Sequence, residues 1–379
     1  MSSLSHRLTD PHSANSVTIT LAGASLTVAT GRPGKERTTT KTFGTPAEAR
    51  QQFEKREWEA LKKGFVLHQP TSPAGEPHLH YYLGKGYTGC LSFVGTPTGI
   101  YVYQNGWDNT SAQPVDYLLR LDAAGTLLAT IALPKILPWD LHYNAPANRL
   151  LLDVDHFIYD YDLATGQFRQ LAAPGSGPGI HWTSFVAVSA TVQAFAAEPT
   201  LHLQTLAGQP LVEIPYRTDL VNGSSVFAAA LSKSGQQLAL HTRFGEIQLL
   251  DTADGRLQST ITGNFTRIAR LEFAANDTML VVHAPWERGP LLFFEVATGR
   301  ALAFPSLALP DNPQDFCFNS DESRLVVLHR DTAWVYDFTG KKLLRSFHLY
   351  HTVKRAQARF VGDALGVRTD YGCFSLYAV

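Results

Sequence analysis

The two histidines of His78-Leu79-His80 come closest to a metal-binding motif in this sequence. Alternate residues of a β-strand point to the same face of a sheet, so both imidazoles could face one ion. A catalytic zinc ion needs about three protein ligands, and no recognisable spacing supplies the third. A pair of surface or channel histidines is therefore the favoured interpretation, and no metal or other cofactor is expected.

Acidic residues are concentrated in the segment LLDVDHFIYDYD. Clustered carboxylates could bind calcium or act as general acid and base. Local turns explain them more simply, because Asp153 and Asp155 bracket a predicted hairpin and Asp162 belongs to a recurrent turn. The remaining polar residues of the segment are His156 and Asp160.

Other reactive constellations are missing from the sequence. The serines of SFVAVSATVQAF lack a GxSxG elbow, and neither GxGxxG nor GxxxxGK[ST] occurs. Cys90, Cys317 and Cys373 are far apart and without CxxC spacing, so we expect buried free thiols. No catalytic residue is assigned, and an enzyme is less favoured than a non-enzymatic protein.

Length and composition favour a large folded chain. Its 379 residues exceed the roughly 250–300 residues that one core usually supports, which predicts two domains or a repeat architecture. The chain is 44% hydrophobic and 17% charged, with a net charge of −1. No apolar run approaches the ~20 residues that cross a bilayer, and the amino terminus lacks an apolar signal region. These features predict a cytoplasmic protein without a membrane partner.

One pattern recurs along most of the chain: an apolar strand ends in an acidic or polar residue, a Gly-containing turn follows, and then another strand. Successive markers are separated by 40, 42, 47, 44 and 42 residues. A period in the low forties with several short strands per unit is typical of propeller blades. The marker residues are Asp122, Asp162, Gln204, Asp251, Glu295 and Asp337.

Counting these units predicts a mainly β fold with a seven-bladed β-propeller. The last unit stops where the others reach their turn, so its outermost strand is missing. An open edge is a hazard that propellers avoid by pairing with a strand from the other end of the chain, and His78 to Tyr87 is the expected donor. The expected blades are 88–133, 139–172, 183–214, 226–262, 268–304, 315–347 and 356–379.

The period resembles that of WD40 propellers, although the repeated GH and WD dipeptides are absent and PWD at Trp139–Asp140 occurs once. Four tryptophans near predicted blade starts or in loops could line a recognition surface, but packing between blades is the favoured role for each. These are Trp107, Trp139, Trp182 and Trp286.

The stretch from Gly31 to Phe65 differs from the remainder and reads as a separate module. Residues 31–63 contain nine Lys or Arg against five Glu, a charge of +4 in a chain of −1. Thr45-Pro46-Ala47-Glu48 is a capping box, and Gly64 stands where a helix ends. An apolar helix face is expected from Ala49, Phe53, Ala60 and Leu61.

In order, TGRPG, TTTKTF and the helix ending in KKGF resemble the WGR domain, a small α+β domain. Thr30 stands where the family has its naming tryptophan. In DNA-dependent poly(ADP-ribose) polymerases WGR domains contact nucleic-acid ends and neighbouring domains, and others occur in bacterial multidomain chains. The resemblance implies that Arg32 takes the role of the motif's arginine.

The resulting division is a WGR-like domain at 15–67, a Pro-rich linker at 68–77 and a propeller at 78–379. We expect an interaction or scaffold protein whose propeller loops bind a protein partner. The first alternative is nucleic-acid binding through the basic module, and the second is a metal-dependent propeller hydrolase or lyase. The residues expected to contact phosphates are Arg32, Lys35, Arg37 and Lys41.

Overall fold

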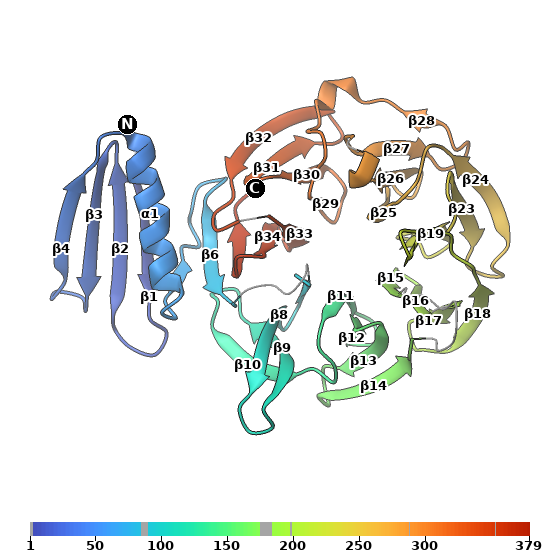
Figure 1. Ribbon diagram of the computed structural model, residues 1–379, viewed down its shortest axis with the longest axis horizontal. Helices are drawn as coiled ribbons and strands as arrows, with labels where there is room; N and C mark the ends of the chain where they lie inside the picture. The colour runs from blue at the N-terminus through green and yellow to red at the C-terminus, as the bar shows by residue number, and fades with distance from the viewer. Residues whose placement is uncertain (1–2, 85–89, 175–183, 198, 288, 353) are drawn as a thin grey trace.

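The computed structural model describes residues 3–84, 90–174, 184–197, 199–287, 289–352 and 354–379. The described chain is mainly β, and six four-stranded antiparallel sheets are arranged as propeller blades in a ring (Figure 1). The first three sheets are β7 (Phe93–Thr96), β8 (Gly99–Asp108), β9 (Gln113–Leu121), β10 (Leu127–Ala132); β11 (Pro138–Asn144), β12 (Arg149–Val154), β13 (Phe157–Asp162), β14 (Gln167–Ala172); and β15 (Ser184–Val188), β16 (Val192–Ala197), β17 (Thr200–Thr205), β18 (Pro210–Pro215).

The other three complete the set, and a small hairpin precedes them. They are β21 (Ala228–Leu231), β22 (Gln237–His241), β23 (Glu246–Asp251), β24 (Leu257–Thr262); β25 (Arg270–Ala274), β26 (Met279–His283), β27 (Leu292–Glu295), β28 (Ala301–Leu302); and β29 (Asp315–Phe318), β30 (Arg324–His329), β31 (Thr332–Asp337), β32 (Lys342–His348). The hairpin is β19 (Leu220–Val221) with β20 (Ser224–Ser225). Two short 3-10 helices, Pro285–Glu287 and Pro305–Leu307, lie in connections.

The recurrent acidic turn connects the third and fourth strands of each of these sheets, as its sequence position predicts. Asp122 Oδ1 accepts hydrogen bonds from the backbone N–H groups of Ala124 and Thr126. Gly125 has φ +80°, which a residue with a side chain adopts only with strain. Asp162 and Asp251 cap their turns in the same way, with Gly166 and Gly255 at positive φ. After Asp337 the positive φ falls on Lys341 instead.

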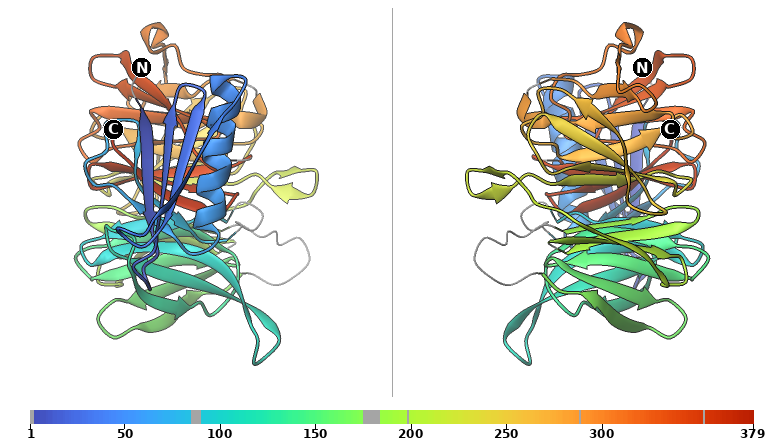
Figure 2. Two further views of the ribbon diagram at one scale, coloured as in Figure 1. Left: turned by 90° about the vertical axis from the view of Figure 1, so that its left-hand side faces the viewer. Right: turned by 90° about the vertical axis from the view of Figure 1, so that its right-hand side faces the viewer.

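The ring has two unlike faces. Neighbouring strands of a sheet run in opposite directions, so their connections alternate between the faces. The acidic turns and the turns between first and second strands share one face. Turns between second and third strands and the links to the next sheet share the other, which we call the hairpin face. The β8–β9 and β19–β20 hairpins extend from this face on the same side of the ring (Figure 2).

The final three strands, β33 (Ala356–Val361), β34 (Ala364–Thr369) and β35 (Cys373–Tyr377), pair in that order. Strand β6 (Pro77–Tyr82) then pairs antiparallel with β35, placing His80 opposite Ser375. The expected donation of an early strand to the open edge is thus confirmed for this segment. Residues 85–87 of the expected donor lie outside the described residues.

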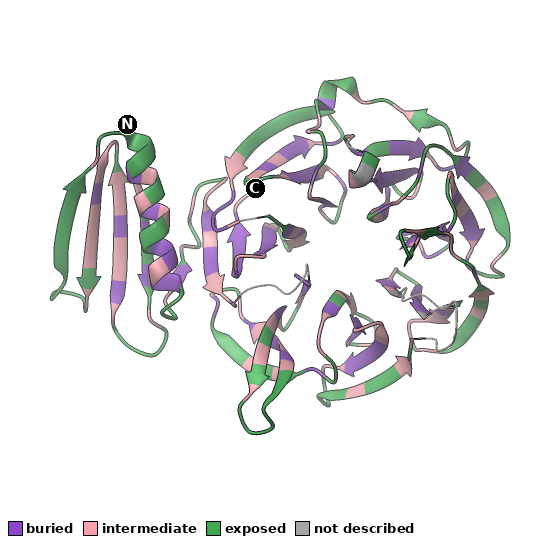
Figure 3. Ribbon diagram, in the orientation of Figure 1, coloured by how far each residue is buried: buried purple, intermediate pink, exposed green. Residues whose placement is uncertain are grey.

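The sheet continues beyond β6 into the amino-terminal unit. Strand β5 (Val66–His68) pairs with β6 and with β1 (Leu4–Thr9), and three more strands complete a nine-stranded sheet. These are β2 (Ser16–Ala22), β3 (Ser25–Gly31) and β4 (Arg37–Thr42). The only β strand of the unit exposed along its whole length is β4, the outermost one in the described chain (Figure 3).

Helix α1 (Pro46–Leu61) covers one face of this unit. It begins as the sequence predicts: Thr45 Oγ1 accepts from the Glu48 N–H, and the Glu48 carboxylate accepts from the Gly44 N–H. The expected apolar face is also confirmed, because Ala49, Phe53, Ala60 and Leu61 are all buried. No helix among the described residues is long and apolar enough to cross a membrane.

The amino-terminal unit is not separate from the ring. One hydrophobic core contains Phe53 and Trp58 of α1 together with Val335 of β31 and Val367 of β34. The Trp58 ring stacks on Tyr371, in the turn before β35, with centroids 4.3 Å apart. The helix of the basic stretch is therefore buried against the ring-closing strands, a contact that the sequence did not predict.

Candidate functional site

The four basic residues expected to contact phosphates lie at the outer edge of the amino-terminal sheet. Arg32 and Lys35 are in the turn between β3 and β4, and Arg37 and Lys41 share one face of β4. All four side chains are exposed, and the Lys41 ammonium lies 4.9 Å from the centre of the Phe43 ring. The structure thus collects them along one edge strand. Lysines on an exposed edge also discourage pairing with another chain.

The acidic segment, which spans β12, β13 and the turn between them, forms turns and ion pairs. Asp153 Oδ1 accepts from the His156 N–H in the turn between β12 and β13. Asp160 is bonded by Arg149 at 2.8 Å and by Arg169 at 2.7 Å. The Asp162 side chain caps its turn as the others do. The turn explanation given by the sequence is confirmed.

The innermost strands of the sheets enclose a channel with a cavity volume of about 1310 Å³. Polar side chains from several sheets line it, and Arg270 is central among them. Its guanidinium donates to Glu272 at 2.7 Å, and to Asp315 of the next sheet at 2.8 Å. Burial raises the pKa of the Glu272 carboxyl despite the charge of Arg270. Burial likewise raises the pKa of the Cys317 thiol. All three cysteines are buried and none forms a disulfide.

Arg359 of β33 forms a second ion pair across the channel wall. Its guanidinium donates to the Leu141 carbonyl at 2.6 Å and to the carboxylate of Asp140, both on β11. Burial opposes ionisation of Asp140, but the charges of Arg359 and then of His142 hold its pKa well below the ordinary value. This contact links the last strands of the chain to the second sheet.

Several exposed apolar side chains lie on the hairpin face. Trp107, at the tip of the β8–β9 hairpin, is 57% exposed. Leu220 of β19 and Phe244 in the β22–β23 turn are also exposed, and Asp219 accepts from the Phe244 N–H, joining these two connections. Trp139 lies at the channel wall, stacked on His156. Trp182 and the side chain of Trp286 lie outside the described part of the chain.

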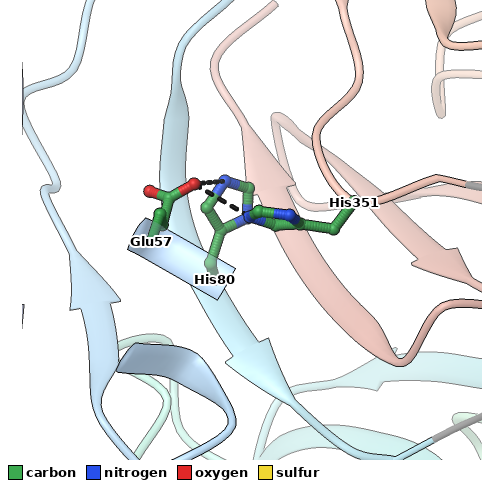
Figure 4. Close-up of side chains that lie close together, drawn as sticks. All are labelled: Glu57, His80 and His351. Atoms are coloured by element: carbon green, nitrogen blue, oxygen red, sulfur yellow. Dashed lines mark hydrogen bonds and ion pairs between the residues drawn. The ribbon is translucent and has the colours of Figure 1, made fainter. Parts of the chain in front are cut away.

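A sealed polar cluster occupies the junction between the amino-terminal unit and the ring. We call it the junction cluster: His6 of β1, Glu57 of α1, His80 of β6, and His351, between β32 and β33. Figure 4 shows the Glu57 carboxylate beside the two imidazoles of His80 and His351. His351 Nε2 lies 2.8 Å from Glu57 Oε2, while His6 Nδ1 contacts Oε1. Both Glu57 and His80 are 0% exposed.

The protonation behaviour of the cluster follows from its burial. Burial alone would raise the pKa of Glu57, but the positive charge of His6 and the bonds from His351 and His6 hold it well below the usual value. Burial lowers the pKa of His80 to about 3, so this imidazole is neutral. For His6 the Glu57 charge and hydrogen bond outweigh burial and raise the pKa to about 9.

Sequence reasoning found one member of this cluster and missed three. His80 was paired with His78, which is only partly buried and lies outside the cluster. Glu57 falls within the apolar stripe of α1, and a charged residue on that stripe is the signal that could have marked it. His6 and His351 carry no local signal, because only the closure of the ring brings them near Glu57.

The fold defines the chain as a β-propeller protein. It is similar to a chain in the crystal structure of the mitotic checkpoint complex, with a TM-score of 0.59 and 12% identity over 82% of this chain and 93% of that one. It is also similar to the computationally designed Ika8 protein, with a TM-score of 0.50 and 17% identity over 79% and 99%. At these identities the likeness concerns the fold alone. No family model matches the sequence, and neither does any curated protein searched.

Proposed function

We propose that this chain is a non-enzymatic interaction scaffold whose hairpin face binds a protein partner. The observation that carries this proposal is the asymmetry of the ring. On one face the turns between third and fourth strands are short, and four of the six are capped by an Asp side chain. The other face extends two hairpins and exposes Trp107, Leu220 and Phe244. Exposed aromatic and apolar anchors are typical of a protein-binding surface.

The test compares two triple variants of the full chain as bait in quantitative affinity capture. One carries W107A, L220S and F244S on the hairpin face. Its matched control carries L127S, L257S and L343S, which replace exposed leucines on the outermost strands. We expect the control to capture the same proteins as the wild type and the hairpin-face variant to lose them. Equal capture by all three would overturn the proposal.

The architecture supports a finer division of the chain. The run β33–β34–β35–β6 has the strand order and antiparallel pairing of the six complete sheets, and we propose that it serves as a seventh blade. In this proposal residues 78–379 are the propeller, residues 68–77 the linker, and residues 15–67 a WGR-like domain. The observation supporting the last assignment is the order of β2, β3, the basic β4 and the capped helix α1.

A second candidate function is nucleic-acid binding by the basic edge. It is supported by the exposure of Arg32, Lys35, Arg37 and Lys41 along the outermost strand, away from the ring. Phosphate contacts release counterions, so the logarithm of the binding constant should fall linearly with the logarithm of salt concentration. R32A and K41A in the full chain should weaken binding to a short DNA duplex and flatten that slope. Unchanged binding by both variants would exclude this function.

The hydrolase or lyase alternative requires imidazoles and carboxylates that converge in the channel. Their ligand atoms must not already be held by other protein groups. The described channel residues are instead engaged with one another. Asp315 is held by Arg270 and by the Ala358 N–H, and His283 Nε2 is bonded to the Pro313 carbonyl. The channel geometry therefore favours recognition over hydrolysis.

A further inference from the structure

We propose that the junction cluster is a structural zinc site in which Glu57, His80 and His351 are the protein ligands. Their ligand atoms, one carboxylate oxygen and two imidazole nitrogens, all lie within 4.8 Å of one another. Imidazole and carboxylate are donors that zinc prefers, with bonds of about 2.0–2.2 Å. The three residues come from α1, β6 and the connection after β32, so one ion would join segments that are far apart in the chain.

The first supporting observation is the geometry around Glu57 Oε2. This oxygen lies 2.8 Å from His351 Nε2 and 4.0 Å from His80 Nε2. Ligand atoms of a tetrahedral zinc ion are separated by roughly 3.3 Å, which follows from the bond lengths. Small side-chain shifts therefore suffice to seat an ion, and the three-ligand set leaves one coordination position for a water molecule.

The second observation is independent and concerns His80. Its Nδ1 is bonded to Ser375 Oγ at 2.7 Å, whereas its Nε2 has no hydrogen-bond partner although the side chain is completely buried. An orphaned polar atom in such a place is costly and calls for an explanation. With the Nδ1 proton donated to Ser375, Nε2 presents a lone pair toward Glu57, which is how metal-binding histidines are oriented.

Two carboxylates lie on the β1 side of the site. His6 contacts the other Glu57 oxygen through Nδ1, and its Nε2 lies 3.6 Å from Glu76 Oε2. The positive charge of His6 therefore offsets only part of the negative charge of this pair. A cation bound at Glu57 Oε2 would further reduce the penalty of burying that carboxylate.

An ion at this place would hold the amino-terminal unit and the two ends of the ring together. The ring is closed without a covalent link, by the pairing of β6 with β35, and His80 lies on β6 within that pairing. Glu57 belongs to the amino-terminal unit, and His351 follows the last strand of the sixth sheet. Because metal binding to a site absent from the unfolded chain adds directly to folding, zinc should stabilise the ring and the amino-terminal unit together.

The test uses the full chain, stripped with EDTA and then supplied with zinc chloride. We expect equilibrium dialysis to find about one zinc ion per chain and the Tm to rise over the stripped protein. H80N and H351N should each weaken zinc binding by at least about tenfold and lose the zinc-dependent rise in Tm. H78N is the matched control on the same strand and should behave as the wild type.

Each variant is compared with itself in zinc and in EDTA, so a general loss of stability does not imitate the expected result. Cobalt chloride supplies a second readout, because cobalt in a nitrogen and oxygen site gives visible absorption bands that should appear in the wild type and H78N but not in H351N. The proposal is overturned if wild-type Tm is unchanged by zinc, or if H80N and H351N bind zinc as tightly as the wild type.

Discussion

The junction cluster and the channel are both built from charged and imidazole side chains held by strands, yet they differ in solvent access. At the junction, Glu57 and His80 are completely buried. In the channel, the side chains of Arg270 and Asp140 remain 27% and 33% exposed. Buried polar groups have no access to water and must find their hydrogen-bond and ion-pair partners in the protein, so they hold chain segments together. Channel groups can exchange one partner for another, which is what a binding surface requires.

From this comparison we expect the largest loss of stability when β6 is removed. Deleting residues 77–84 removes β6 together with His80 and exposes the edge of β35. We expect loss of the cooperative fold, a cost of at least about 5 kcal/mol, which is comparable with the whole stability of a typical domain. Thermal unfolding followed by circular dichroism measures it.

The control shortens an exposed hairpin that we expect to contribute little to folding. Replacing residues 109–112, the exposed tip of the β8–β9 hairpin, by Asn-Gly leaves the strands paired through a favoured two-residue turn. This variant should melt close to the wild type. A β6 deletion that melted like the parent would show that the ring does not depend on the donated strand.

Glu57 should be next in effect. E57L removes the acceptor of His6 and His351 and leaves these buried imidazoles without their partner. Breaking a buried ionic cluster from one side costs about 3–5 kcal/mol. E59Q is the control on the same helix, since Glu59 forms only a surface pair with Arg56. Urea titration measures both variants, and equal stabilities of E57L and E59Q would contradict a structural role for the cluster.

Arg359 and Asp140 should give a smaller, pH-dependent effect. R359Q removes a charged link between β33 and β11, at a cost of about 1–3 kcal/mol. Because the folded pKa of Asp140 is below its ordinary value, the pair stabilises the fold fully above about pH 5 and loses this contribution as pH falls through the folded pKa. Stability measured down to about pH 3 should therefore fall less steeply in D140N than in the wild type. An equal fall in stability with pH for D140N and the wild type would contradict this role of the Asp140 carboxylate.

The hairpin face should show the smallest effect on folding. W107A removes a side chain that is more than half exposed, and substitutions at such sites usually change stability by less than about 0.5 kcal/mol. Its effect is expected in partner capture instead. A large loss of stability in W107A would mean that Trp107 packs within the ring rather than serving recognition.

The sequence predicted the repeating parts of the fold well, because each blade carries its own signals. Asp162 and Gly166 mark a turn through local hydrogen bonds and backbone conformation, and these need no distant partner. The pairing of an early strand with the last repeat was also predicted, and β6 does pair with β35. The relation of the amino-terminal unit to the ring did not follow, since Trp58 and Tyr371 meet only after closure.

Candidate sites were harder to predict for the same reason. The basic edge residues are close together in the chain, so their grouping on β4 and the turn before it could be predicted from composition. Glu57, His80 and His351 are separated by long stretches of sequence, and no spacing rule connects them. The channel pairs, such as Arg359 with Asp140, join strands from different sheets. Only the order of the sheets around the ring determines which strands meet.

The central claim is that the junction joins the amino-terminal unit and the ring into one cooperative unit. Hydrogen exchange measured by mass spectrometry on the full chain tests it most directly. We expect the amides of α1, β6 and β34 to open with the same free energy, and E57L to lower this opening free energy for all three elements together. Exchange of α1 at a much lower free energy than β34, with E57L affecting α1 alone, would contradict it.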